Sequence, residues 1–577
     1  HSVPVSWQFF SFRSFIITTI TNIRYGSTIR ERVWLGVLAV GLFLSGIFLI
    51  WLVQINLLTN VSSGGGTYTY AVVGVPRFIN PILAQNDSEK ELVRLVYSGL
   101  VREIAHDVYI PDLAESYTMS PDEKTYTFTI KPDLVFHDGK PLTINDIVYT
   151  YKQLQKSSLA EYSGWRTVQI TNTENTITLT LTQPYGDFLK MTTVGILPAH
   201  IWESLSDTSL VSSQFNSSPI GSGPYKIDSI VTNNSGIPES YSLKRFKKFA
   251  IGTPHLKKIT VLTTASATEY INLMNTGKLD GGVINGTYEN ILAMDIPNTL
   301  TVENKPSAKV FALFFNTTSK TTIDTELRSL INATLNRKEL VTTITGGTAH
   351  PLYEPLPEVA KNNSLVTDAD ITKFNAYFKK NGYQKNQTTG IFEKKEGTIN
   401  REFRITITLL DHPEFKKIAT ELKKYYAQLG ITLDLEIFQI NDFEHEVLAK
   451  RNYQVVLFGY TATRPADLYA YWHSSQKNYP GLNISGYQNN DLDKQLEYVI
   501  SHHATDTTVD AYEKIKSIIR RDIPAIFIYN PADFIIHKKT LVVPQFPIPL
   551  SHNTDYLNTI SLWYTKTDAV LSVFNHD

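Results

Sequence analysis

The most prominent hydropathy feature of the chain is an unbroken apolar run of 21 residues, from Val33 to Val53, with no charged side chain. At about 1.5 Å per residue, a helix of this length spans about 30 Å, the thickness of a bilayer's hydrocarbon core. After about Gly66 the chain changes to the mixed spacing of a water-soluble protein. The pattern therefore predicts one N-terminal transmembrane helix that tethers a globular body.

The charges beside this run predict its orientation. Four arginines precede it, opposed only by Glu31, whereas the next Lys or Arg after it is Arg77. The positive-inside bias places the N-terminus in the cytoplasm and the body on the extracytoplasmic side. A cleaved signal peptide is the alternative, but its apolar core is shorter, about 7–15 residues, and ends at a small-residue cleavage site, which we do not find. We expect a cytoplasmic tail at 1–32, a transmembrane helix at 33–53 and a linker at 54–67.

Two segments of the body have the period of half-buried strands. KTYTFTI (124–130) and NTITLTLT (175–182) alternate apolar side chains with threonines. Successive strand residues point to opposite faces of a sheet, so this alternation predicts one buried face and one polar face. Together the two segments indicate an antiparallel sheet.

Other segments have the period of amphipathic helices. We expect a helix at 142–155, capped by Thr143, and a second helix at 324–336, closed by the Asn-Arg pair at 336–337. A third helix is expected to begin at an Asp411 cap and to end at Leu429. Gly430 is expected to end the last of these in a left-handed conformation. Because the strand-like strings FRITITLL and ITLDLEI flank this helix, the order predicts a βαβ unit.

Length and composition narrow the class of protein. The body of about 510 residues exceeds the size of a single core, so at least two lobes are expected. A net charge of −1 argues against a nucleic-acid partner. The absence of cysteine excludes disulfides, thiol catalysis, Cys-ligated metals and lipid anchoring through a cysteine. The 31 Tyr and 28 Phe residues supply stiff surface for ligand contacts as well as for the core.

The sequence lacks the motifs of common enzymes. There is no G-x-S-x-G elbow and no phosphate-binding G-x-x-x-x-G-K-[ST] loop. His445-Glu446 opens like a zinc-protease helix, but Ala449 occupies the position of the second histidine. We therefore predict a protein that is not an enzyme, with no catalytic residues, no metal and no cofactor.

Several unusual strings occur in a fixed order along the body. They include NPILAQND (80–87), LVYSGLV (95–101), FHDGKPLTINDIVYTY (136–151), GSGPYKI (221–227), LMNTGKLDGGV (273–283) and YWHSSQKNYPGLNISGYQNNDLDKQL (471–496). In this order they resemble the extracytoplasmic solute-binding proteins of bacterial peptide-type ABC transporters, the dipeptide/oligopeptide-binding family (family 5). The resemblance covers roughly residues 68–550. Most of the strings also have a purely structural interpretation as turns and caps.

The resemblance implies an α/β fold, a two-lobed clamp of the periplasmic-binding-protein type (type II) with mixed sheets. Lobe I would hold 67–308 and 530–577, and lobe II 309–529, joined by two strand-like crossings. A monomer would capture short peptides in the cleft, close over them and deliver them to the permease subunits of an ABC importer. Two alternatives stay open, namely an extracytoplasmic sensor and a carrier of a non-peptide solute such as a metal chelate, a sugar or an opine. An extracytoplasmic hydrolase would need a nucleophile and base that we do not find.

The same resemblance points to a segment for ligand binding, LFGYTATRPADLYAYW (457–472). Many relatives bind the peptide's amine with an Asp in a W-x-x-D-Y-like string, where this chain has Tyr460 and Thr463. Asp467, four residues on, either replaces that Asp or only caps a short helix. Arg464 either meets a ligand carboxylate or is a solvated cation.

Five further residues are candidates for the lining of the pocket. For Trp472 the alternative is a place in the core of lobe II. The candidates are Tyr225, Phe315, Asn316, Trp472 and His473.

Overall fold

The computed structural model describes residues 28–56, 58–62, 64–105, 107–157, 159–286, 288–318, 323–357, 366–502, 506–543, 553–565 and 567–571. The chain divides into two compact units. One holds residues 1–63 and 566–577, and the other, the globular body, holds 64–565.

The smaller unit is built on the apolar run. Helix α2 (Ile29–Asn56) contains the whole run, and its segment Ile29–Leu49 is apolar and long enough to cross a membrane. Strand β1 (Leu58–Ser62) follows it and pairs antiparallel with β24 (Thr567–Leu571). The segments that enter and leave the globular body are therefore hydrogen-bonded to each other. Most of the expected cytoplasmic tail lies outside the described residues.

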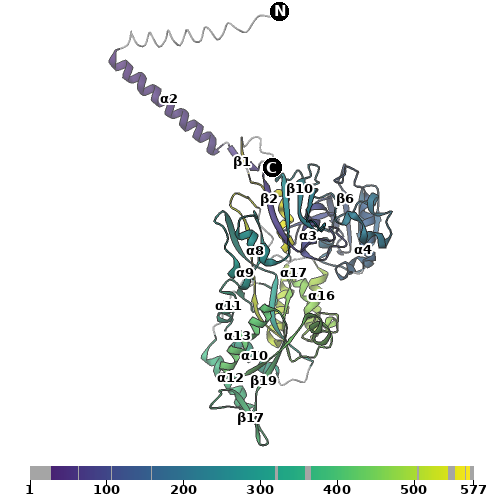
Figure 1. Ribbon diagram of the computed structural model, residues 1–577, viewed down its shortest axis with the longest axis vertical. Coiled ribbons are helices and arrows are strands. Elements are labelled where there is room, and N and C mark those ends of the chain that lie inside the picture. The colour runs from purple at the N-terminus through teal and green to yellow at the C-terminus, as the bar shows by residue number, and fades with distance from the viewer. Residues whose placement is uncertain are drawn as a thin grey trace, which may run out of the picture. The chain divides into compact units, whose positions relative to one another are not determined.

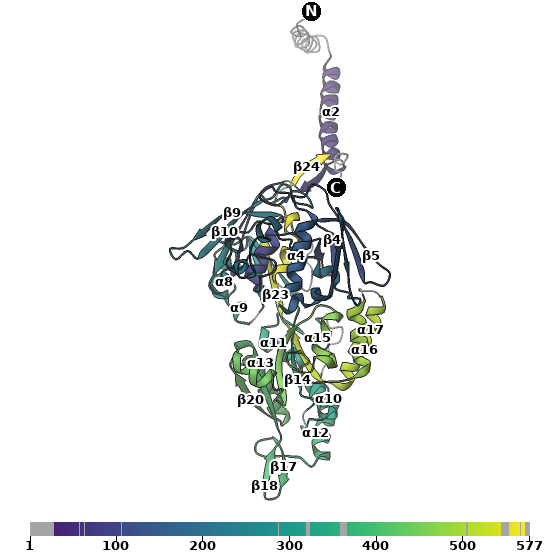
Figure 2. The same ribbon diagram turned by 90° about the vertical axis from the view of Figure 1, so that its right-hand side faces the viewer.

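The globular body has two lobes (Figures 1 and 2). We call residues 64–308 and 530–565 lobe I and residues 309–529 lobe II. The two-lobed mixed-sheet fold expected from the resemblance is confirmed by this architecture and by the comparisons with solved structures below.

In its described residues, lobe I contains four small sheets. In the order of neighbouring strands, the first sheet contains β2 (Thr67–Val73), β11 (Lys258–Thr264), β10 (Pro238–Arg245) and β9 (Tyr225–Thr232), and the second contains β12 (Gly281–Asn285), β23 (Ala532–Lys538) and β13 (Leu300–Pro306). The third sheet pairs β3 (Val101–Ala105) with β4 (Val108–Pro111). The fourth contains β5 (Ala114–Met119), β6 (Thr125–Ile130), β8 (Thr176–Thr180) and β7 (Gln169–Asn172). Its helices are α3 (Asp87–Val96), α4 (Ile144–Lys156), α5 (Phe188–Met191), α6 (Ala199–Trp202), α7 (Asp207–Ser212), α8 (Ala267–Asn275), α9 (Tyr288–Ala293), and the 3-10 segments η2 (Ala160–Thr167), η3 (Gln214–Asn216) and η7 (Asn553–Leu562).

The described part of lobe II is organised around one six-stranded mixed sheet. Its strands are, in order, β15 (His350–Pro351), β22 (Ala525–Asn530), β14 (Lys309–Phe315), β21 (Val455–Thr461), β19 (Arg404–Leu410) and β20 (Thr432–Phe438), with a second sheet of β16 (Gln384–Lys385), β17 (Phe392–Glu396) and β18 (Ile399–Glu402). The helices are α10 (Thr325–Thr334), α11 (Arg337–Thr345), α12 (Asp368–Lys380), α13 (Pro413–Leu429), α14 (Ile440–Asp442), α15 (Tyr469–Trp472), α16 (Asn490–Ser501), α17 (Asp506–Asp522), and the short η4 (Phe443–Leu448), η5 (Pro465–Leu468) and η6 (Ser474–Gln476).

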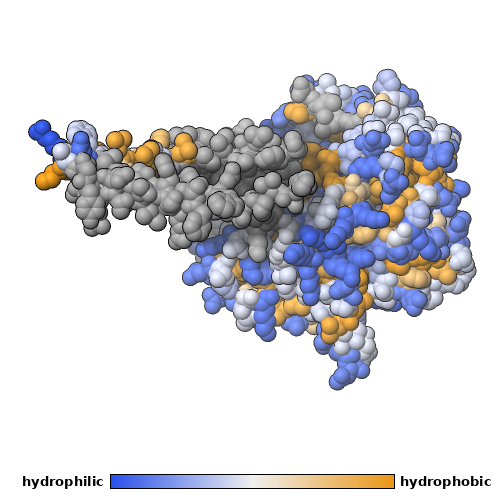
Figure 3. Space-filling model, turned by 90° about the horizontal axis from the view of Figure 1, so that it is seen from above, coloured by the Kyte–Doolittle hydropathy of each residue, from blue (hydrophilic) through white to orange (hydrophobic). Residues whose placement is uncertain are grey.

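Strand β14 shows how the lobe II sheet is covered. Its sequence, KVFALFF, is apolar at every position after the first, which is the pattern of a strand buried on both faces. Val310, Ala312 and Phe314 pack in one core, whereas Phe311, Leu313 and Phe315 belong to another. The globular surface mixes hydrophilic and hydrophobic residues (Figure 3), in contrast to the apolar run of α2.

Most of the elements expected from periodicity are confirmed. Strands β6 and β8 pair antiparallel with alternating burial, Thr143 caps α4 with Asp146, and β19, α13 and β20 form a parallel βαβ unit. Gly430 ends α13 with a left-handed φ of 102°.

Two expected helix ends are wrong. His412, not Asp411, caps α13, because Pro413 fixes the first turn and places His412 before it. Asn336 does not close a helix but caps the next one, α11, by accepting from the Glu339 N–H. Arg337 is buried and donates to the carbonyl of Phe527 at 2.7 Å and to the carbonyl of Asn332, in the last turn of α10, at 3.2 Å. The expected cation at the end of this helix is therefore present.

Two adjacent crossings join the lobes. The chain passes from β13 to β14 through Ser307, and from β22 to β23 through Pro531. The Ser307 N–H donates to the Pro531 carbonyl at 2.9 Å, and the buried Asn530 amide donates to the carbonyls of Ser307 and Lys309. The crossings are thus bonded to each other, which suits a two-strand hinge.

Asp533, in β23 beside this hinge, makes stability depend on pH. Its side chain is 5% exposed, and burial, only partly opposed by Lys309, raises its pKa to about 7. The native state therefore keeps a proton that the unfolded chain loses near pH 4, so this contribution is complete below about pH 4 and is lost as the pH rises through about 7. We expect the free energy of unfolding to fall between those values with a limiting slope of about 1.4 kcal/mol per pH unit.

The measurement is denaturant unfolding of the wild type and Asp533→Asn across pH 4–8. Since asparagine resembles the neutral carboxyl group, the difference in unfolding free energy between the two proteins should change with pH in this window. A difference that stays constant with pH contradicts the prediction.

Candidate functional site

The lobes meet at an ionic cluster centred on Arg464. This residue begins the turn before η5 in lobe II, and its guanidinium is 2.6 Å from Asp187 and 3.0 Å from Asp107, both in lobe I. Asp467 of its own turn lies 3.1 Å away. One guanidinium thus pairs with three carboxylates, two of which lie across the boundary. Nearby, the Gly186 N–H donates to the carbonyl of Ile500 in lobe II at 2.9 Å, so the lobes are in direct contact here.

Burial makes these charges interdependent. The Arg464 side chain is 10% exposed, and although burial alone would lower its pKa, the three carboxylates raise it. Asp187 is 16% exposed, and burial raises its pKa to about 6 in spite of Arg464. Burial acts on Asp467 in the same direction, but Arg464 and the Thr463 N–H hold the pKa of Asp467 below its usual value. Arg464 is therefore the counter-ion on which the other charges depend.

A cavity of about 380 Å³ opens beside this cluster. Arg464 and Asp187 line it, with Lys190 next to them. Two buried polar atoms in lining residues, the Tyr97 hydroxyl and Asp112 Oδ1, have no hydrogen-bond partner among the described residues. Aromatic side chains form much of the remaining wall, namely Tyr97, Tyr162, Trp165 and Tyr185. The arrangement suits an extended solute with both polar and apolar groups.

A smaller cavity of about 180 Å³ shares Arg464 and Asp187 with the first. It is lined from lobe I by Asp107 and Tyr109 and from lobe II by Pro465 and Val499, among others. Both lobes therefore contribute side chains to the two cavities, which is the condition for a ligand to favour the closed state.

The structure places the candidates from the 457–472 segment in different settings. Arg464 lies at the boundary, whereas the Asp467 carboxylate accepts from the Thr463 N–H at 2.8 Å and from the Arg464 N–H at 3.2 Å, as a helix cap does. Tyr460 is buried in the core of lobe II, and its hydroxyl donates to the Pro355 carbonyl. The binding roles of these residues stay predictions.

The other candidates are buried and line neither of the two cavities. Tyr225 lies in the core of lobe I, and Phe315 and Trp472 in cores of lobe II, where Trp472 stacks on Phe314 with ring centroids 5.6 Å apart. The Asn316 amide donates to the carbonyls of Arg451 and Tyr453. Their binding roles also stay predictions.

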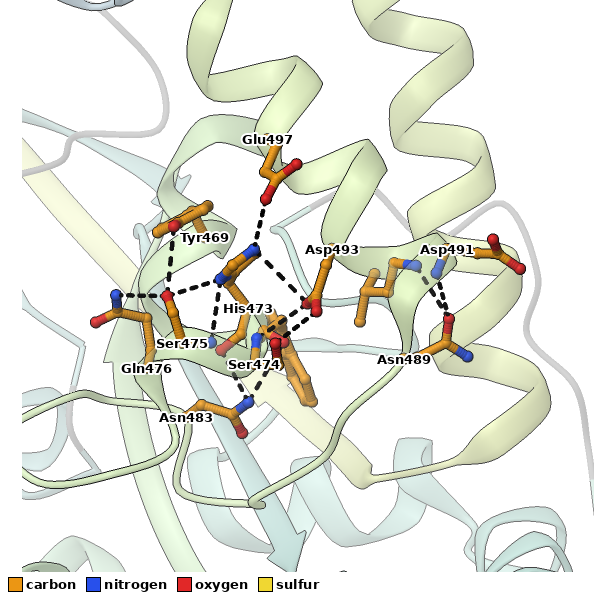
Figure 4. Close-up of polar contacts among 12 residues, drawn as sticks. Tyr469, His473, Ser474, Ser475, Gln476, Asn483, Asn489, Asp491, Asp493 and Glu497 are labelled. Carbon is orange, nitrogen blue, oxygen red and sulfur yellow. Dashed lines mark hydrogen bonds and ion pairs between the residues drawn. The ribbon is translucent and has the colours of Figure 1, made fainter.

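His473 holds the loop after α15 (Figure 4). Its Nδ1 lies 2.7 Å from the Ser475 hydroxyl, and its Nε2 lies 3.3 Å from Glu497 of α16. Asp493, on the same helix, accepts from the Ser474 N–H at 2.9 Å. These contacts connect the loop to α16 (Figure 4).

Sequence reasoning missed Asp107, Asp187 and the aromatic wall. Asp107 is in a turn with a positive φ of 57°, and Asp187 follows a glycine in a loop, so neither belongs to a recognisable pattern. These two residues can be recognised only from their contacts with Arg464 in the folded protein. Asp107 and Arg464 are 357 residues apart in the sequence.

Comparison with known proteins identifies the class. Residues 108–480 match the family model of bacterial extracellular solute-binding proteins, family 5. The chain therefore belongs to this family, whose members are solute-binding proteins of ABC transporters, and the resemblance seen in the sequence is confirmed.

Similar curated proteins carry peptide-binding names. The oligopeptide-binding protein AppA of Bacillus subtilis is 24% identical over 489 residues, covering 81% of this chain and 86% of that protein. The probable D,D-dipeptide-binding periplasmic protein DdpA of Escherichia coli is 24% identical over 436 residues, covering 73% of this chain and 78% of that protein.

Solved structures show the same fold. AppA from Bacillus subtilis in complex with a nonapeptide has a TM-score of 0.63 and 20% identity, over 88% of this chain and all of that one. The ABC transporter substrate-binding protein CtaP from Listeria monocytogenes has a TM-score of 0.69 and 25% identity, over 87% of this chain and all of that one. NikZ from Campylobacter jejuni, in complex with Ni(L-His), has a TM-score of 0.65 and 21% identity, over 86% of this chain and 99% of that one.

Proposed function

We propose that this protein is a membrane-tethered receptor that captures short peptides between its lobes and delivers them to the permease of an ABC importer. The observation that carries the proposal is the boundary itself, where both lobes line a cavity, together with the two bonded crossings that connect the lobes. A ligand stabilises the closed form only through contacts that improve on closure, and such a boundary supplies them.

Peptide fits this cavity better than a compact solute does. Its wall offers aromatic faces, which cover side chains of many kinds, and charged groups of both signs, which suit the two ends of a peptide. The peptide-binding names of the relatives support the same ligand class. The length and apolar composition of α2 support the tether, which would keep the receptor beside its permease.

The test is a titration of the full chain, in lipid nanodiscs, with peptides of two to nine residues. We expect saturable binding with a Kd of about 1 µM or below for at least one length class, and a smaller radius in X-ray scattering when the ligand is present. A folded protein that binds none of these peptides would overturn the peptide assignment. Nickel–histidine is the comparison solute, since NikZ carries it.

A further inference from the structure

The cavity of about 380 Å³ beside the Arg464 cluster, which we call the boundary cavity, has a mostly cationic set of charged lining residues. Two of them are carboxylates, Asp112 and Asp187, and five are cations, namely Lys90, Arg94, Arg102, Lys190 and Arg464. With all seven ionised, the formal charge of this described lining is +3. A peptide with uncharged side chains is a zwitterion with one charge of each sign, so it leaves this positive excess uncompensated.

The two lining carboxylates are already paired with two of these cations. The Arg102 guanidinium lies 2.8 Å from Asp112, and the Arg464 guanidinium lies 2.6 Å from Asp187. All four side chains are at most 16% exposed, so each pair is poorly screened by solvent. The positive excess of the boundary cavity therefore comes from the other lining cations.

Lys190 is a lining cation whose charge is not paired. It lies in α5 and is half-buried, and its ammonium group makes no hydrogen bond or ion pair with the part of the chain that the structure describes. Arg94, by contrast, lies 3.4 Å from Asp555, outside the lining. Burial raises the pKa of Asp187 to about 6, and Lys190 opposes this rise less strongly than Arg464 does. The charge of Lys190 is therefore close to the ionic cluster and still open to a solute.

Tyr97 adds a hydrogen-bond donor to the same cavity. It is 3% exposed, and its hydroxyl has no hydrogen-bond partner among the described residues. Burial raises the pKa of this phenol, so it keeps its proton and can donate. A buried donor without a partner is unfavourable until an acceptor reaches it. A carboxylate only accepts hydrogen bonds and carries the charge opposite to that of Lys190, so it suits both groups.

We propose that the boundary cavity selects peptides with an acidic side chain, and that Lys190 determines this preference. The inference rests on the proposed function, and it concerns a side-chain carboxylate of the peptide rather than its C-terminus. A glutamate or aspartate side chain gives the peptide a net negative charge, which compensates part of the positive lining. A lysine side chain increases the excess instead, and peptides that carry it are rejected by repulsion.

The experiment is calorimetry on the full chain in lipid nanodiscs, with peptides that differ in one charge. In the length class that binds most tightly, glutamate, glutamine or lysine replaces each position in turn of an all-alanine peptide. The proteins are the wild type, Lys190→Gln and the control Lys152→Gln, which removes an exposed lysine of α4 that does not line the cavity.

At one position or more, we expect the wild type to bind the glutamate peptide at least about tenfold more tightly than the glutamine peptide, the effect of one charge-assisted hydrogen bond. The lysine peptide should bind more weakly than either. Lys190→Gln should weaken only the glutamate peptide and so bring its affinity to within about threefold of the glutamine peptide. Lys152→Gln should keep the wild-type preference.

Equal affinity of the wild type for the glutamate and glutamine peptides at every position overturns the inference, and this result stands even if Lys190→Gln fails to fold. A variant that loses affinity for both peptides alike shows that Lys190 does not act on the side chain, which also overturns it. A glutamate preference that Lys190→Gln leaves intact supports the acidic ligand class and overturns the role of Lys190.

Failure of the proposed function gives a different result. In that case no length class of peptide binds, and a titration with glutarate, a small dicarboxylate, decides the charge selection. Glutarate that binds the wild type at least tenfold more tightly than Lys190→Gln supports selection of carboxylates by Lys190 in a non-peptide solute. Glutarate that binds both proteins alike, or neither, overturns the inference together with the proposed function.

Discussion

Replacing Arg464 with glutamine should open the clamp and weaken ligand binding by up to about 30-fold. The substitution leaves Asp107, Asp187 and Asp467 close together without their shared counter-ion. Loss of one partner from a fully buried ion pair costs about 3–5 kcal/mol. Since Asp107 and Asp467 are 28% and 25% exposed, solvent screens part of the repulsion among the carboxylates. We therefore expect the substitution to raise the free energy of the closed state by about 2 kcal/mol relative to the open state.

An energy of this size lowers the closed population, and the apparent affinity falls by the same fraction. X-ray scattering of the ligand-free protein should show a larger radius for Arg464→Gln than for the wild type, and calorimetry should show the higher Kd. The matched control is Arg404→Gln, which removes an exposed arginine paired with Asp434 and Glu402 within lobe II. If both variants behave like the wild type, the cluster does not hold the lobes together.

Replacing Trp472 with alanine should destabilise the protein by about 3–5 kcal/mol, the usual range for a large buried aromatic residue. Trp472 is fully buried, stacks on Phe314 and meets Phe527 edge-on with centroids 6.0 Å apart. The lost contacts leave a void between α15 and the central sheet of lobe II, which the neighbouring side chains fill only partly. Denaturant unfolding should show an earlier transition for lobe II.

This substitution also tests the pocket role expected from the sequence. Trp472→Phe keeps much of the packing, so a core residue predicts a smaller loss of stability and an unchanged ligand Kd for this variant. A Kd that rises with Trp472→Phe, while the unfolding midpoint stays at the wild-type value, would instead show that the indole contacts the ligand.

Periodicity predicted the elements well because it reflects local burial. The alternation of Phe128 and Ile177 with polar residues sets one face of β6 and β8 against the core, and this requires no knowledge of distant partners. Helix ends were less certain where two capping residues are adjacent, as at Asp411 and His412. There, the fixed φ of Pro413 decides which residue caps.

The candidate site was only partly predictable. The 457–472 segment contains Arg464, which lies at the lobe boundary, whereas its role in ligand binding stays a prediction. Tyr225, Phe315 and Trp472 are buried in cores, because aromatic residues in glycine-rich or polar strings serve packing as readily as binding. The acidic partners Asp107 and Asp187 lie in loops, whose sequence carries no period.

The sequence by itself determined the apolar N-terminal segment, the family and several of the strands and helices, because each of these depends on neighbouring residues or on short strings. Tertiary structure alone decided which charges meet across the lobes and that Lys190 lines a cavity with an excess of positive charge. Those arrangements join residues hundreds of positions apart, as Asp187 and Arg464 show, and burial, which sets their charge state, exists only once the chain has folded.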